Sequence, residues 1–66
     1  MELLIIKTGS RYIRVKPEGL ITVNLDKASV FPMDRLDHVR DIADKAAESG
    51  FDAVTVKKLV LSEEDL

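Results

Sequence analysis

The chain has 66 residues, a net charge of −2 and no cysteine, which excludes a disulfide framework and a thiolate metal site. Apolar residues make up 45% of the sequence and charged residues 33%, a globular rather than a disordered composition. We therefore predict a single domain over residues 1–66, near the lower size limit for unaided folding. Because no apolar run reaches membrane-spanning length and no signal peptide is visible, we expect a cytoplasmic protein.

The first part of the chain predicts three strands joined by two tight turns. Residues 2–7 are apolar on both faces of an extended chain, as in a central strand. Residues 11–16 and 20–25 alternate between apolar and polar side chains, which indicates half-buried strands. Turn signals at 8–10 and 17–19 separate the three segments. Together they predict an antiparallel meander.

A connector over residues 26–32 leads to the one predicted helix, which extends to Glu48 or Ser49. Its entry has two alternatives: Pro32 at the first helical position, or Asp34 as the N-cap. Gly50 is placed for a left-handed C-terminal cap, after which Phe51 returns to the core.

Residues 53–61 predict a fourth strand that changes phase. Val54 and Val56 share one face and Leu59 and Leu61 share the other, so we predict a β-bulge at the lysine pair 57–58. This strand could pair with the first strand or the third. Residues 62–66 are predicted to form a frayed acidic tail.

The order β-β-β-α-β predicts an α+β fold with a mostly antiparallel sheet and one helix packed on one face. The predicted core joins four helix residues to four strand residues: Leu36, Val39, Ala43 and Ala46 with Ile13, Val15, Ile21 and Val23. On this basis Leu36→Ala should cost about 2–5 kcal/mol. One helix cannot cover both faces of the first strand. Its second apolar face, either Leu3 with Ile5 or Leu4 with Ile6, would need another cover, such as a second copy in a homodimer.

The strongest functional feature is a row of acids along the predicted helix, called here the acidic stripe. Its members are Asp34, Asp37, Asp41, Asp44 and Glu48. At about 100° per residue they fall within an arc of roughly 80°, over about 21 Å of helix. Like charges at this spacing destabilise a helix by about 0.2–0.5 kcal/mol per pair. The stripe is therefore either a binding surface for a basic partner or a solubilising surface.

Other chemistries are weakly indicated. Asp34 and His38 have a two-ligand helical spacing, but a metal site needs three or four ligands, so we expect no metal and no cofactor. No nucleophile motif surrounds any serine, and we expect no enzymatic activity. A predicted hairpin carries Tyr12 among basic residues, a poor version of a single-strand-binding platform. We interpret it as a solvated edge and expect no direct nucleic-acid partner and no membrane partner.

The size, the acidic helix and two segments, 27–32 (KASVFP) and 58–64 (KLVLSEE), resemble short proteins of phages and mobile elements. Among these the chain is similar to anti-CRISPR proteins, some of which are nucleic-acid mimics. The resemblance implies an inhibitor that presents the acidic helix to a basic, nucleic-acid-binding surface of a CRISPR effector in the host bacterium. Anti-CRISPR proteins share no common fold, so it carries over no functional residue. The alternative is a structural module that oligomerises through the uncovered sheet face.

Overall fold

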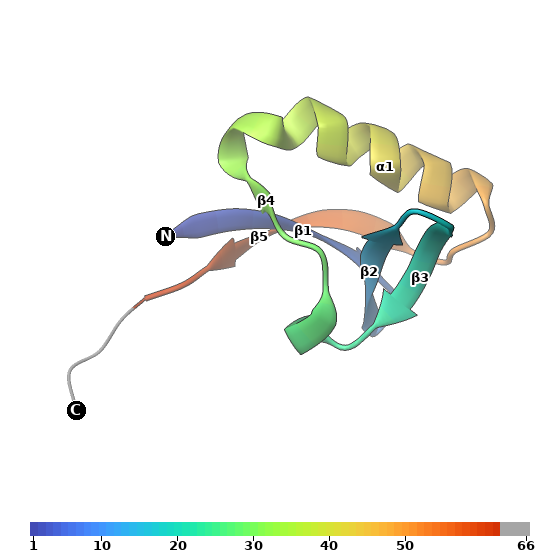
Figure 1. Ribbon diagram of the computed structural model, residues 1–66, viewed down its shortest axis with the longest axis horizontal. Coiled ribbons are helices and arrows are strands. Elements are labelled where there is room, and N and C mark those ends of the chain that lie inside the picture. Colours follow the sequence, from blue (N-terminus) through green and yellow to red (C-terminus); the bar gives the residue numbers. More distant parts are fainter. Residues whose placement is uncertain (63–66) are drawn as a thin grey trace.

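The computed structural model describes residues 1–62, which form one sheet with a helix on one face (Figure 1). The strands are β1 (Glu2–Thr8), β2 (Arg11–Lys16), β3 (Gly19–Val23), β4 (Phe31–Pro32) and β5 (Val54–Val60), and the helix is α1 (Leu36–Glu48). Two short 3-10 turns are η1 (Leu25–Lys27) and η2 (Met33–Arg35). The predicted α+β class is confirmed. The tail predicted at 62–66 lies, apart from Ser62, outside the described residues.

Strand β1 is the centre of the sheet, as its apolar sequence predicts. On one side it pairs with β5 in an antiparallel ladder from Glu2–Val60 to Thr8–Val54. On the other side it pairs with β2 near its end and with β4 near its start. The fourth predicted strand therefore pairs with the first. Strand β3 pairs with β2 alone among the described strands.

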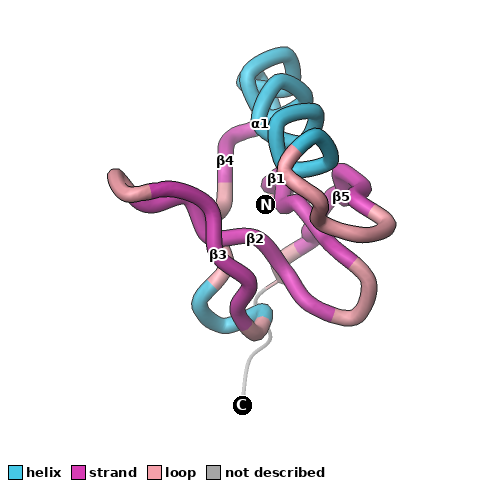
Figure 2. Tube along the Cα trace, turned by 90° about the vertical axis from the view of Figure 1, so that its right-hand side faces the viewer, coloured by secondary structure: helices cyan, strands magenta, loops and turns pink. Residues whose placement is uncertain are grey.

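The connector after β3 fills the space that opens where β2 leaves β1. The Ser29 backbone N–H donates to the Ile13 carbonyl at 3.2 Å. The Ser29 hydroxyl oxygen accepts a hydrogen bond from the Val15 backbone N–H at 2.9 Å. Two residues later the chain reaches β4 and joins β1. The β2–β3 hairpin is thereby held at an angle to the β1–β5 pair (Figure 2).

The core lies between α1 and the face of β1 that carries Leu4 and Ile6. Val39 and Ala46 of α1 are fully buried, and Ile42 is nearly so. Leu36 and Ala43 are partly buried against the same core, so the predicted apolar face of the helix is confirmed. Five further side chains pack around it: Leu20, Phe31, Phe51, Val54 and Val56.

The strand side of the predicted core is partly wrong. Val15 and Ile21 are 41% and 38% exposed. The register places Ile21 opposite Arg14, on the face of the hairpin away from Ile13. Val15 shares the face of Ile13 but lies farther along the hairpin, where it diverges from α1. Val23 is buried as predicted, but the register places it on the same face as Ile21. Among the predicted strand residues, Ile13 therefore packs in this core, where the other buried strand residues are Leu4 and Ile6 of β1.

The predicted bulge in β5 is also wrong, because the ladder with β1 advances one residue at a time through Lys57 and Lys58. Lys58 consequently shares the face of Val54 and Val56. Its ammonium group lies 2.8 Å from the Glu2 carboxylate, and both side chains are about half exposed. The ion pair with Glu2 thus accommodates the charge of Lys58 on this face, and the strand keeps its regular alternation of faces.

The two ends of α1 differ in how well the sequence predicts them. Neither predicted entry is right, because Pro32 precedes η2, Asp34 lies within η2, and Arg35 is the N-cap of α1. The exit is confirmed. Gly50 has φ of +98°, its N–H donates to the Ala47 carbonyl, and the Phe51 N–H donates to the Ala46 carbonyl. This pair of bonds is a Schellman cap.

Candidate functional site

The structure places the acidic stripe on two elements. Asp37, Asp41, Asp44 and Glu48 lie on α1, and Asp34 lies in the preceding turn η2. A 3-10 turn has about 3.0 residues per turn, so Asp34 departs from the spacing of the other four. All five side chains are exposed. The four acids on α1 span about 17 Å of helix axis at 1.5 Å per residue.

The carboxylates of the stripe face solvent. Within residues 1–62, the ion pairs closer than 4 Å are Lys16–Glu18 and Lys58–Glu2, and neither includes a stripe residue. Three basic residues flank the stripe, namely Arg35, Arg40 and Lys45. The opposite face of the helix holds the buried Val39 and Ala46. Charge and burial are therefore separated on the two faces of one 13-residue helix.

His38 lies beside the acidic stripe, and its side chain packs against an aromatic ring. Its imidazole meets the Phe31 ring edge-on, with centroids 6.1 Å apart and an interplanar angle of 72°. Over residues 1–62, no group of three or more histidine or acidic side chains is arranged to hold a metal ion. The contact with Phe31 ties the first turn of α1 to β4.

The side of β1 away from α1 forms a second candidate surface, called here the far face. It comprises Met1, Leu3 and Ile5 with Leu59 and Leu61 of the neighbouring chain segment. Met1 and Leu61 extend the ladder, since each donates its nitrogen-bound hydrogen to the other's carbonyl at 2.8 Å. Leu3 and Ile5, not Leu4 and Ile6, are thus the second apolar pair of β1.

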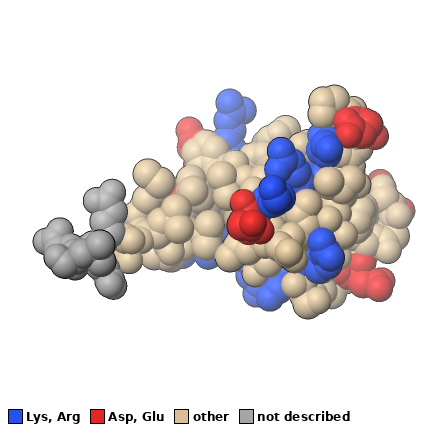
Figure 3. All heavy atoms as spheres, turned by 60° about the horizontal axis from the view of Figure 1, so that its bottom comes forward, with Lys and Arg blue, Asp and Glu red and all other residues tan. Residues whose placement is uncertain are grey.

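Burial on the far face falls steadily toward the start of the chain. Ile5 is 4% exposed, Leu3 is half-buried and Met1 is 80% exposed. Leu61 is 44% exposed. Figure 3 looks onto the side opposite α1, where basic and acidic side chains are interspersed over one half and the half toward the chain ends is largely uncharged. The exposed apolar area is therefore smaller than the sequence predicts, because Ile5 is already covered.

A third feature is absent from the sequence-based expectations: a cleft of about 560 Å³ between α1 and the β2–β3 hairpin. Its lining consists of Val15, Glu18, Gly19, Leu20, Ile42, Lys45, Ser49 and Phe51. These residues come from the hairpin, the helix and the turn after the helix. The cleft exists because the hairpin diverges from α1, and no local pattern encodes that divergence. Val15 is the predicted core residue that lines this cleft, and its side chain is exposed.

Comparisons with protein-family models, with curated proteins and with solved structures found no match to this chain. None of the helices described in residues 1–62 combines the length and apolar character needed to cross a bilayer.

Proposed function

We propose that this protein is a non-catalytic interaction module whose acidic stripe binds a basic surface on another protein. The observation that carries the proposal is the segregation within α1. One face is buried in the core, while the other holds four exposed carboxylates without an ion pair to residues 1–62. Such a surface adds no packing to the fold, and the repulsion of about 0.2–0.5 kcal/mol for each like-charge neighbour pair is offset by attraction to the flanking Arg40 and Lys45.

The natural target of this surface is a protein groove rich in lysine and arginine. The four acids on α1 follow one another about every 5.5 Å, from 1.5 Å of rise per residue. A single nucleic-acid strand carries one charge per about 3.4 Å. The stripe would therefore act as a sparse competitor for a groove that normally holds a nucleic-acid strand. Its more specific form is the one that the resemblance implies: a phage-borne inhibitor of a CRISPR effector, acting in the bacterial cytoplasm.

The test is differential capture from a bacterial lysate. Asp37, Asp41 and Asp44 are replaced together by Asn, which removes charge and keeps shape. We expect the wild-type protein to retain a basic protein that the triple variant does not, and single-stranded nucleic acid to release it. The retained affinity should fall steeply with salt, because the contacts are exposed charges. An identical set of captured proteins for both variants would contradict the proposal.

The far face favours a second candidate function, assembly with another copy of this chain. Met1, Leu3, Leu59 and Leu61 form an apolar surface that α1 leaves uncovered. Light scattering over a range of concentrations tests it, with Leu59→Lys as the disrupting variant. A concentration-dependent dimer that Leu59→Lys abolishes would support assembly, whereas a monomer at every concentration would exclude it. The triple Asn variant is the control and should keep the wild-type assembly state.

A further inference from the structure

The cleft supplies what the acidic stripe lacks as a binding surface. Exposed ion pairs contribute about 0–1 kcal/mol each and mainly speed association. Affinity at protein interfaces comes mostly from a few apolar or aromatic side chains that become fully desolvated in a pocket. A stripe of solvated carboxylates therefore needs an apolar anchor point nearby if it is to hold a partner for long.

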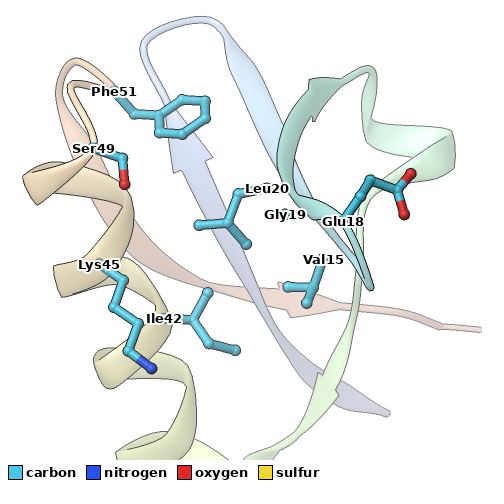
Figure 4. Close-up of a pocket in the computed structure, with 8 residues that line it drawn as sticks. All are labelled: Val15, Glu18, Gly19, Leu20, Ile42, Lys45, Ser49 and Phe51. Atoms are coloured by element: carbon cyan, nitrogen blue, oxygen red, sulfur yellow. The ribbon is translucent and has the colours of Figure 1, made fainter.

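The walls of the cleft suit such an anchor. Val15, Leu20, Ile42 and Phe51 converge on its interior, and the Glu18 carboxylate points away from it (Figure 4). Its volume of about 560 Å³ lies within the range of ligand pockets and exceeds what one side chain occupies. Val15 is 41% exposed, so one wall already presents apolar surface to water that a partner would remove.

The helical wall of the cleft lies about a quarter turn around α1 from the acidic stripe. Each of its three residues follows a stripe acid in the sequence: Ile42 follows Asp41, Lys45 follows Asp44, and Ser49 follows Glu48. One residue is a turn of about 100° around the helix axis. Of the residues lining the cleft, Lys45 alone is basic. An incoming apolar side chain therefore enters beside Lys45, and basic residues that flank it extend around the helix to reach the stripe carboxylates.

The geometry points to one occupant: an apolar side chain, such as leucine or phenylalanine, flanked by lysines or arginines in a segment of the basic partner. The apolar side chain occupies part of the cleft, and the basic neighbours reach Asp41, Asp44 and Glu48. This inference rests on the proposed function and deepens it. The stripe determines how fast the partner is captured, and the cleft determines how long it stays.

The probe is a capped heptapeptide with three lysines on each side of a central leucine. Its control carries glutamine at the centre. Chemical-shift changes in backbone amides of the isotope-labelled protein give both the affinity and the place of binding. We expect the leucine peptide to bind about tenfold more tightly than the glutamine peptide, as partial burial of one leucine side chain would give. Its largest shifts should fall on Leu20, Ile42 and Phe51.

Two matched variants test the cleft itself. Val15→Phe fills it from β2, while Ile21→Phe adds the same ring at similar exposure on the other face of the hairpin. Val15→Phe should remove the preference for leucine, and Ile21→Phe should keep it. Ser49→Phe fills the cleft from the end of α1. It replaces Val15→Phe in this test if that variant does not fold. In the triple Asn variant both peptides should weaken, with their tenfold ratio preserved.

The outcomes separate this inference from the proposed function. Equal binding of the two peptides, or a leucine preference that survives both filling variants, overturns the cleft as the anchor site and leaves the stripe as a docking surface. Equal peptide affinity for the wild type and the triple Asn variant contradicts the proposed function. It also contradicts the basic character assigned to the partner. Shifts centred on Leu3 and Leu59 would place the apolar contact on the far face and also overturn the inference.

Discussion

The two faces of α1 have the same backbone and opposite relations to the rest of the protein. One face places Val39, Ile42 and Ala46 in the core, and the other places Asp37, Asp41 and Asp44 in solvent. The apolar face packs in a core to which all five described strands and the turn after the helix contribute. The acidic face makes no ion pair within residues 1–62. The buried face and the acidic face of the helix can therefore be altered separately.

The largest effect should follow a change on the buried face. Ile42→Ala removes buried methyl groups from the core and widens the cleft that Ile42 lines, at a cost of about 2–5 kcal/mol. A domain of this size has about 3–10 kcal/mol of stability in total. We expect urea denaturation followed by circular dichroism to show a much lower midpoint or a largely unfolded chain. A midpoint close to that of the wild type would mean that this face is not packed as described. Leu36→Ala should cost less than Ile42→Ala, because Leu36 is only half-buried.

A smaller effect on stability is expected at the C-terminal end of α1. Gly50→Ala forces a residue with a Cβ atom into φ of +98°. No neighbouring atom lies within 4 Å of that Cβ position, so the cost is backbone strain alone, about 1–2 kcal/mol. Gly50→Asn is the matched variant, since asparagine tolerates left-handed backbone better. Thermal unfolding should rank the three proteins in the order glycine, asparagine, alanine. Equal melting temperatures for alanine and glycine would contradict the cap.

A still smaller effect on stability is expected in the sheet, where Glu2 and Lys58 form an ion pair. The acids of the stripe form none within residues 1–62. The hydrogen bond from Lys58, together with its charge, lowers the pKa of Glu2 below 4.5. The same bond raises the pKa of Lys58 above 10.5. The Glu2 contribution is present above pH 4.5 and is lost as the pH falls through the lowered pKa. The Lys58 contribution is present below pH 10.5 and is lost as the pH rises through the raised pKa.

Because both groups are solvent-exposed, the expected change in stability is slight. Comparing urea midpoints of the wild type and Glu2→Gln over a pH series measures it. The difference between the two proteins should vanish at both extremes of pH. A constant difference at every pH would show that the ion pair is not its source.

Local patterns predicted most of the fold. The apolar run of β1, the alternation in β2 and β3 and the glycine at the end of α1 each determine a structure within a few residues. The acidic stripe was equally visible, because helical spacing can be read from sequence alone. Each of these features depends on residues that are close together in the sequence.

Two of the errors arise where residues distant in sequence decide the outcome. Lys58 keeps its phase because Glu2 lies within reach across the ladder, which alternation within β5 cannot reveal. Ile21 faces away from Ile13 because the turn at 17–19 sets the register of the hairpin. Val15 is exposed in the cleft, and its backbone N–H donates to the hydroxyl of Ser29, which lies 14 residues away in the sequence. The positions of Lys58 and Val15 involve contacts distant in sequence, whereas that of Ile21 depends on the register of a local hairpin.

If the acidic face of α1 serves binding and not the fold, the triple Asn variant should be about as stable as the wild type. Replacing Asp37, Asp41 and Asp44 relieves like-charge repulsion of about 0.2–0.5 kcal/mol per pair and loses comparable attractions to Arg40 and Lys45. We predict a free energy of unfolding within about 1 kcal/mol of the wild type, with a difference that shrinks as salt is added. A loss of more than about 2 kcal/mol would contradict the account, because it would show that the acids serve the fold.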